Sequence, residues 1–315
     1  MFFGEWLIYC ILALVFYGAV NVLDTFFVEE EIYENANEGI IVGSIFKILG
    51  FIIVGGLFFD QFMTVDFLNA VLAILAGLFL SAAFWFYFRA AFVYNDLSLV
   101  QIFWNLSVPL IAIIGWFFLD EKFSFINYFG MVLVVLGAGF VSFSKEGVPP
   151  TFKKFLLLNI PLIILYSFSE TVMKYVEEWG NIDFWASFPY VCLGQVVFGI
   201  ILLAINYKKI KKDKLYERII GGNTHLFVFS EFLELGGMFF MMLAIAKTPA
   251  VVFYAVMETF MPLVVIMMTG IAGYIMNFLG KSESLKNIYK NNHIAGIKVK
   301  ILAVIAMAIG IYFMR

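Results

Sequence analysis

The sequence has 315 residues, of which 63% are hydrophobic and 14% are charged. This is too little polar surface to cover a soluble globule of that length, so the composition indicates an integral membrane protein. The formal net charge is -3, and the absence of a basic stripe argues against a nucleic-acid partner. Cys10 and Cys192 lie in apolar runs, where a thiol acts as a small hydrophobic group, and His225 and His293 are isolated. We therefore expect neither a metal site nor a cofactor.

Ten apolar runs are long enough to cross the membrane as helices, which takes about 20 residues for about 30 Å of hydrocarbon. They fall near residues 3–23, 38–59, 67–93, 97–119, 123–143, 155–176, 183–206, 224–246, 249–276 and 297–314. Helices are favoured over strands because membrane β-strands give alternating segments about half as long. The first run has no basic n-region and no convincing cleavage site, so we interpret it as a span and not as a signal peptide. The sequence therefore predicts an all-α, multi-pass protein in the lipid bilayer.

A proline-containing stretch in the middle of the chain divides it into two halves. Residues 144–154 contain Gly-Val-Pro-Pro, which is typical of a loop. We accordingly expect a first five-helix unit at 1–146, a linker at 147–154 and a second five-helix unit at 155–315. Since five is an odd number, the second unit would cross the membrane in the opposite direction to the first.

The two halves also align with each other. Residues 89–109 lie over residues 242–262 without a gap at an offset of 153, which places Pro109 on Pro262 and Asn105 on Glu258. Two such units form an inverted repeat, a common design of transporters, in which the binding site lies between the halves near the membrane midplane.

Basic residues are distributed unequally between the two sets of loops. Of the 20 Lys and Arg residues, 15 lie on one set of alternate loops or their flanking turns, with the densest group at 207–222. The positive-inside rule places this set in the cytoplasm and both termini outside.

One segment resembles a known transporter family. Ser98 to Gln101 open an apolar run, Pro109 lies within it, Asp120 and Glu121 end it, and Gly130 and Gly137 follow. This pattern resembles the drug/metabolite transporter superfamily, specifically its EamA-type members. The resemblance implies a ten-helix bundle with a central cavity, alternating access on small solutes, and both termini in the cytoplasm. We expect the protein in the plasma membrane. The sequence departs from the family at Asp120, where a glycine is usual, and it lacks the matching glutamate in the second half.

The aligned prolines suggest where a solute could bind. Asn105 and Glu258 each lie four residues before a proline, Pro109 and Pro262, which cannot donate the helical hydrogen bond to that residue's carbonyl. Each kinked helix would then offer a free carbonyl beside a polar side chain, suited to a solute or an ion. The alternative is that a neighbouring hydroxyl or a water satisfies each carbonyl and the prolines only shape the bundle.

Ionisable residues inside spans are further candidates, because each costs about 2.5–3.5 kcal/mol to insert. Glu231 and Glu234 are three residues apart and would form a proton site for a coupled carrier, unless only Glu234 is buried. Lys47 lies too deep to reach water and needs a carboxylate partner, with Glu234 or Glu258 as candidates. We count Glu231, Glu234, Glu258 and Lys47 as coupling candidates.

The remaining cavity candidates are polar or aromatic residues within spans. Glu170 precedes Lys174 by four residues, the favourable order for an ion pair within a helix, and aligns with Asn21 at an offset near 149. The other residues expected to line a cavity are Gln101, Trp104, Gln195 and Tyr254.

Taken together, these features predict a secondary transporter of a small metabolite, such as an amino acid or a related polar solute. Two alternatives stay open, a lipid-carrier flippase on the same fold and a membrane-embedded enzyme. The enzyme is disfavoured because the sequence has neither a HExxH nor a GxSxG motif. A homo-oligomer is also left open.

Overall fold

The computed structural model describes residues 5–29, 33–94, 97–118, 124–142, 151–212, 224–247 and 297–314, with isolated residues at 215, 217 and between 257 and 272. All regular structure in these residues is helical, and no strand occurs among them. Most of the predicted ninth span, the Asp120-Glu121 turn and part of the predicted 147–154 linker lie outside the described residues.

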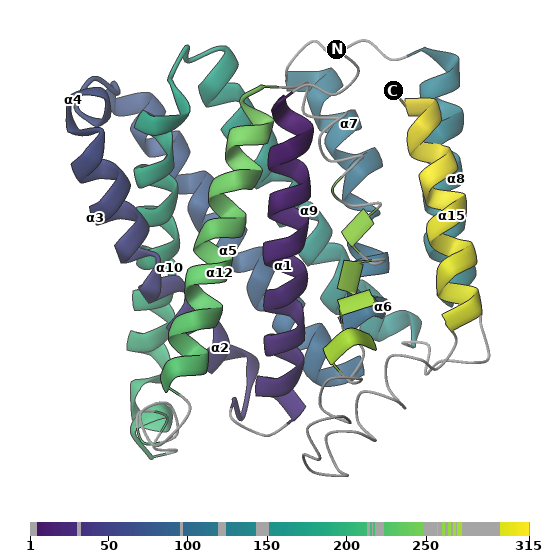
Figure 1. Cartoon of the computed structure of the whole chain (residues 1–315), viewed down its shortest axis with the longest axis horizontal. Coiled ribbons are helices and arrows are strands. Elements are labelled where there is room, and N and C mark those ends of the chain that lie inside the picture. The colour runs from purple at the N-terminus through teal and green to yellow at the C-terminus, as the bar shows by residue number, and fades with distance from the viewer. Residues whose placement is uncertain are drawn as a thin grey trace.

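The described helices stand roughly side by side in one bundle (Figure 1). Helix α1 begins, and helix α15 ends, at the same end of the bundle, at the top of Figure 1. The helices are α1 (Glu5–Glu29), α2 (Ala36–Phe46), α3 (Ile48–Leu57), α4 (Phe59–Phe62), α5 (Phe67–Tyr94), α6 (Leu97–Trp104), α7 (Ser107–Phe118), α8 (Phe125–Ser142), α9 (Phe152–Glu178), α10 (Phe184–Lys212), α12 (Thr224–Ile245) and α15 (Ile297–Met314).

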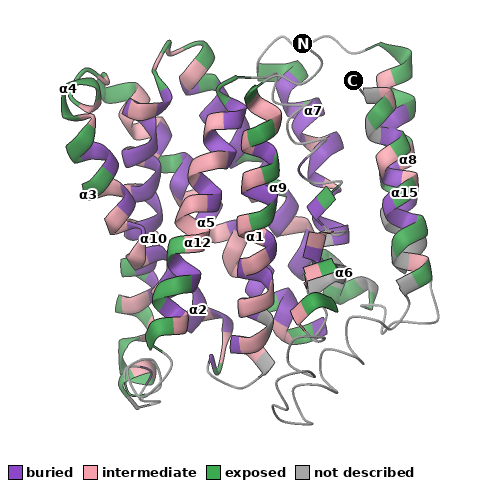
Figure 2. Ribbon diagram, in the orientation of Figure 1, coloured by how far each residue is buried: buried purple, intermediate pink, exposed green. Residues whose placement is uncertain are grey.

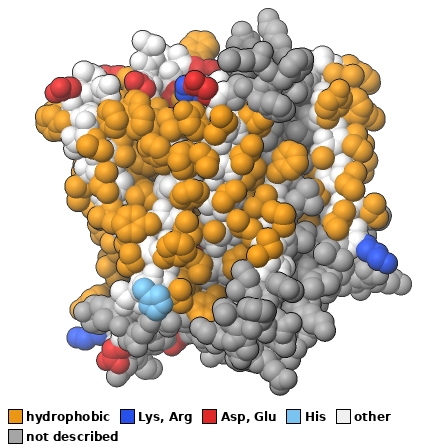
Figure 3. Space-filling view, in the orientation of Figure 1, with side chains coloured by type: hydrophobic (Ala, Val, Ile, Leu, Met, Phe, Trp, Pro, Cys, Tyr) orange, Lys and Arg blue, Asp and Glu red, His pale blue; other side chains and the backbone are white. Residues whose placement is uncertain are grey.

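The length and apolar character of these helices show a multi-pass membrane protein. In the described part of the chain, six helical segments are long and apolar enough to span a bilayer, and three shorter apolar helices accompany them. Large apolar side chains such as Phe117, Leu136 and Ile205 are more than half exposed. Figure 3 shows such side chains as a broad band, with charged side chains near its upper and lower edges. Such an apolar belt between charged ends is what a lipid environment requires.

Two predicted spans are broken helices, which corrects the expectation of continuous ones. The span predicted at 38–59 is interrupted at Lys47, where α2 ends and α3 begins. The N–H of Lys47 bonds to the Ser44 carbonyl three residues back, at 3.3 Å, so the helical ladder tightens at this point. The break leaves the Lys47 side chain buried inside the bundle.

The second break explains the position of Pro109, which we expected in a helix interior. Helix α6 ends at Trp104 and α7 begins at Ser107, so Pro109 lies in the first turn of α7. The proline ring clashes with the carbonyl four residues back, which belongs to Asn105, and the helix breaks there. The Asn105 carbonyl accepts the N–H of Val108 at 3.2 Å, so the expected free carbonyl is wrong for this helix.

Small residues allow the helices to cross closely. A Cβ on Gly77 of α5 would collide with the Val191 carbonyl oxygen of α10, and one on Gly194 would collide with the Ile74 carbonyl oxygen of α5. In the pair α8 and α15, a Cβ on Gly310 would lie 2.6 Å from the Gly130 carbonyl oxygen. Figure 2 shows buried residues in every long helix, including those at the centre of the bundle. Packing of this kind relies on small residues because lipid gives helices no hydrophobic drive to associate.

Candidate functional site

A cavity lies at the centre of the bundle, bounded by α1, α2, α5, α6, α9, α10 and α12. About 80 Å³ of it is open to the centres of water-sized molecules. One water needs about 10–15 Å³ on this measure, so the space holds several waters or a small organic solute. Carboxylates in its wall are Asp24, Glu231 and Glu234, and its amide side chains are Asn21 and Gln195.

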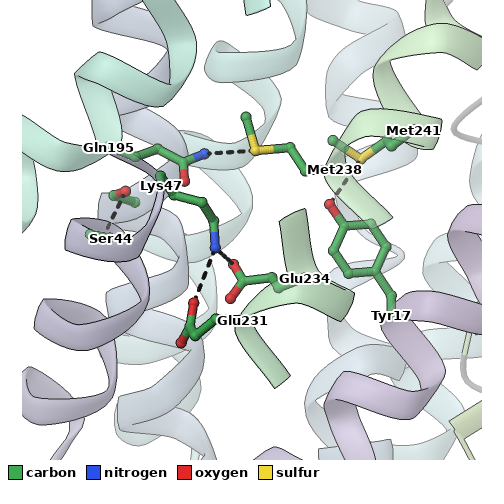
Figure 4. Close-up of polar contacts among 9 residues, drawn as sticks. Tyr17, Ser44, Lys47, Gln195, Glu231, Glu234, Met238 and Met241 are labelled. Carbon is green, nitrogen blue, oxygen red and sulfur yellow. Dashed lines mark hydrogen bonds and ion pairs between the residues drawn. The ribbon is translucent and has the colours of Figure 1, made fainter. Parts of the chain in front are cut away.

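A lysine that does not itself line the cavity contacts two of these carboxylates (Figure 4). The Lys47 Nζ is 3.1 Å from Glu234 Oε1 and 3.4 Å from Glu231 Oε2, and the lysine side chain is 1% exposed. The expected pairing of Lys47 with Glu234 is therefore present. The two glutamates lie one turn apart on α12, so both reach the break between α2 and α3. This contact connects two helices whose residues are 184 positions apart in the sequence.

The alternative that only Glu234 is buried is wrong. The Glu231 side chain is 7% exposed and the Glu234 side chain is 22% exposed, so Glu231 is the deeper of the two. Gly43 leaves room for the Glu231 carboxylate, since a Cβ there would lie 3.3 Å from Glu231 Oε1. Both glutamates line the cavity, and Glu234 is the more exposed of the two.

Neutral polar contacts connect the other helices around the cavity. Tyr87 Oη on α5 donates to Asn21 Oδ1 on α1 at 2.7 Å, so the Asn21 candidate lies in the cavity wall. The Ser44 and Ser81 hydroxyls are 3.2 Å apart between α2 and α5. Gln195, another candidate in the wall, donates to Met238 Sδ at 3.4 Å, as Figure 4 shows. These contacts fix the positions of the helices without adding net charge.

Asp24 is a cavity residue that the sequence analysis missed. The first predicted span ends near residue 23, one residue before Asp24, but α1 continues to Glu29 and carries Asp24 inside the bundle. The residue is 8% exposed, lies in the cavity wall, and has neither a hydrogen bond nor an ion pair with another described residue. The apolar residues Phe26, Phe27 and Val28 that follow it are the signal that the helix continues.

The break between α6 and α7 brings several polar groups together without partners. Trp104 is 5% exposed and lies in the cavity wall, and its Nε1 has no hydrogen-bond partner among the described residues. Both side-chain polar atoms of Asn105 and the Ser107 hydroxyl also have none there. Asn105 is fully buried beside the cavity wall but does not form part of it. Unpaired buried polar groups are rare in folded proteins, so each of these atoms marks either a cost in stability or a place for a water or ligand.

The remaining candidates are spread over other places. Glu170 is 1% exposed on α9 but does not line the cavity. Lys174 Nζ pairs with Glu178 Oε1 at 2.8 Å, one turn further along α9, and donates to the Ile245 carbonyl at 3.3 Å. Gln101 belongs to α6, but its side chain lies outside the described part of the structure. Tyr254, Glu258 and Pro262 also lie outside the described residues.

The fold and the cavity define a multi-pass helical membrane protein with a buried, acidic polar centre. Among the described residues, no group of three or more His, Cys, Asp and Glu side chains is arranged to hold a metal ion. No protein-family model matches the chain, and no curated protein matches it.

Proposed function

We propose that this protein is a secondary transporter of a small polar metabolite that works by alternating access. The single observation that carries the proposal is the cavity with charged residues at the centre of an apolar bundle. Charged side chains inside a membrane cost about 2.5–3.5 kcal/mol each to insert and are kept where they serve a solute or ion path. Asp24, Glu231, Glu234 and Lys47 together represent a large cost for a protein that only needs to be stable.

The contacts between helices support a ten-helix arrangement of two inverted repeats. Helix α5, the third span of the first half, packs against α9, the first span of the second half. Helix α12, the third span of the second half, packs in turn against α1, the first span of the first half. Tyr94 of α5 contacts Asn159 of α9 at 2.6 Å. Under the sequence offsets of 153 and 149, these residues correspond to Lys247 and Cys10. Lys247 lies over the ring of Tyr9, the neighbour of Cys10, at 5.9 Å.

Helices that occupy the same position in the two halves also pack against each other, as a two-fold axis between the halves requires. Helix α2 packs against α10, and α8 packs against α15. Gly137 approaches Ala303 while Gly310 approaches Gly130, so α8 and α15 run antiparallel. This symmetry favours the EamA-type architecture and a site between the two halves.

Charge placement bears on orientation in the plasma membrane, which we propose as the location. The positive-inside rule favours external termini, while the EamA resemblance implies cytoplasmic ones. A reporter enzyme fused after Arg315, active on only one side of the membrane, distinguishes the two orientations.

Transport is tested with the purified protein in liposomes. A panel of labelled amino acids and polar metabolites is offered with and without an imposed pH gradient, and uptake above protein-free liposomes is expected for at least one solute. Glu234→Gln should lower that uptake because Glu234 faces the cavity, and Glu5→Gln is the matched control because Glu5 is exposed at the bundle end. Equal uptake by the two variants, or no uptake of any solute, would overturn the proposal.

A further inference from the structure

The cavity carries more negative than positive charge. Its described wall contains three carboxylates and neither lysine nor arginine. The nearby cation, Lys47, contacts Glu231 and Glu234. One lysine balances one carboxylate, so the other two are costly in a buried place unless a proton or a positively charged guest neutralises them. Because an uncompensated buried carboxylate is costly, this environment favours a positively charged guest.

Asp24 is the carboxylate available to such a guest. It is more than nine-tenths buried and lies in the cavity wall, and the charges of Lys47, Glu231 and Glu234 act on it, but it has no hydrogen bond or ion pair with another described residue. Lys47 contacts the two glutamates of α12, whereas Asp24 comes from α1. Asp24 can therefore take an external cation without breaking an ion pair.

Aromatic side chains surround the same space. Tyr33, Phe84, Tyr87, Phe88 and Trp104 all line it, and they hold one another in edge-to-face contacts such as Tyr87 with Trp104 at 5.6 Å. The faces of aromatic rings attract cations, and cages of such rings are used to bind quaternary ammonium groups. A carboxylate within an aromatic wall therefore suits an organic cation better than a small, strongly hydrated metal ion.

The wall also disfavours a solute that carries a carboxylate. Its described residues present no free cation to such a group. One unpaired donor in the wall is Trp104 Nε1, which is buried and has no described acceptor. A neutral N–H suits an uncharged oxygen such as a hydroxyl or a carbonyl.

We propose that the cavity binds a small organic ammonium ion, with Asp24 as its counter-ion, the aromatic wall around its alkylated head, and Trp104 Nε1 donating to an uncharged oxygen. That the ion is also carried across the membrane rests on the function proposed above. Binding itself can be measured without transport.

Choline and its uncharged carbon isostere, dimethylbutanol, form the central pair of probes. Binding to the purified full chain in detergent is followed by tryptophan fluorescence and by the thermal midpoint, since a ligand of the folded state raises that midpoint. Choline is expected to raise the midpoint and the isostere is not. Betaine, which adds a carboxylate to the same head group, should bind about tenfold more weakly or worse. Equal effects of choline and dimethylbutanol, or tighter binding of betaine, would overturn the proposal.

Two variants assign the contacts. Asp24→Asn should weaken choline binding by about tenfold or more, because a contact with a charged group is lost. Asp60→Asn is the matched control, since Asp60 is exposed on α4 and should leave binding unchanged. Trp104→Phe should weaken binding of choline but not of tetramethylammonium, which has no oxygen, and this comparison also serves if Asp24→Asn fails to fold. Unchanged choline binding in Asp24→Asn, or equal effects of Trp104→Phe on both ions, would refute the assignment.

The two proposals fail separately. Choline that binds with the expected pattern but does not enter liposomes contradicts transport and supports the inferred site. A neutral or anionic solute that is transported while choline does not bind supports transport and overturns the inferred site.

Discussion

Replacing Lys47 with methionine is expected to destabilise the protein, because this removes the cation that two buried carboxylates share. The Nζ lies 3.1 Å from Glu234 and 3.4 Å from Glu231. Each attraction is about 5 kcal/mol at an effective dielectric constant of about 20. Most of that gain offsets the cost of taking the charges out of water, but removing one partner leaves the others uncompensated, which costs about 3–5 kcal/mol. Since the Glu234 side chain is 22% exposed and keeps some hydration, we expect a loss near 3 kcal/mol.

The loss is measured as the free energy of unfolding in detergent, from a denaturant titration followed by tryptophan fluorescence. Adding Glu231→Gln to Lys47→Met should recover part of the loss, because it removes one of the uncompensated charges. Lys247→Met is the matched control: its partner Glu5 is exposed, and exposed ion pairs contribute little. A Lys47→Met protein as stable as the wild type, or no recovery in the double variant, would refute this reasoning.

Three further predictions concern packing, capping and the helix break. Gly77→Ala should lower the free energy of unfolding by about 1–3 kcal/mol because its Cβ meets the Val191 carbonyl. Gly56→Ala, with no atom within 4 Å of the added Cβ, should leave the thermal midpoint nearly unchanged; equal effects of the two variants would contradict the close crossing. Asp66 caps α5. Its carboxylate accepts hydrogen bonds, mainly from Asn69, and these hold the pKa of the carboxyl below its usual range. Its stabilisation should therefore be complete above the ordinary pKa of about 4 and be lost as the pH falls through the lower folded-state value. Asp66→Ala should accordingly lower the thermal midpoint at neutral pH, with the gap to the wild type closing in acid, and a gap independent of pH would argue against this role. Asn105→Leu should raise the free energy of unfolding by about 1 kcal/mol, because it removes a buried amide without described partners. A fall in stability in the same titration would instead indicate that a water or ligand satisfies that amide.

Much of the cavity could be approached from the sequence, because charged residues inside apolar runs are rare. Lys47, Glu231 and Glu234 were singled out for this reason, and the structure brings all three together. Glu170 met the same criterion but lies away from the cavity. Asp24 was missed because it stands at the acidic edge of an apolar run. At such an edge the local sequence is the same whether the helix ends there or continues into the bundle. A local pattern shows that a group is in the membrane but not which neighbours it faces.

The sequence by itself determined that this is a helical, multi-pass membrane protein and where most of its helices lie. That follows because the length of an apolar run and the need to satisfy the backbone inside lipid are properties of each segment alone. Only the tertiary structure decided that Lys47 meets carboxylates 184 or more residues away. It also decided that Asp24 faces the same cavity. Such meetings depend on how closely helices distant in the chain can approach, and this is set by the small residues at their crossings.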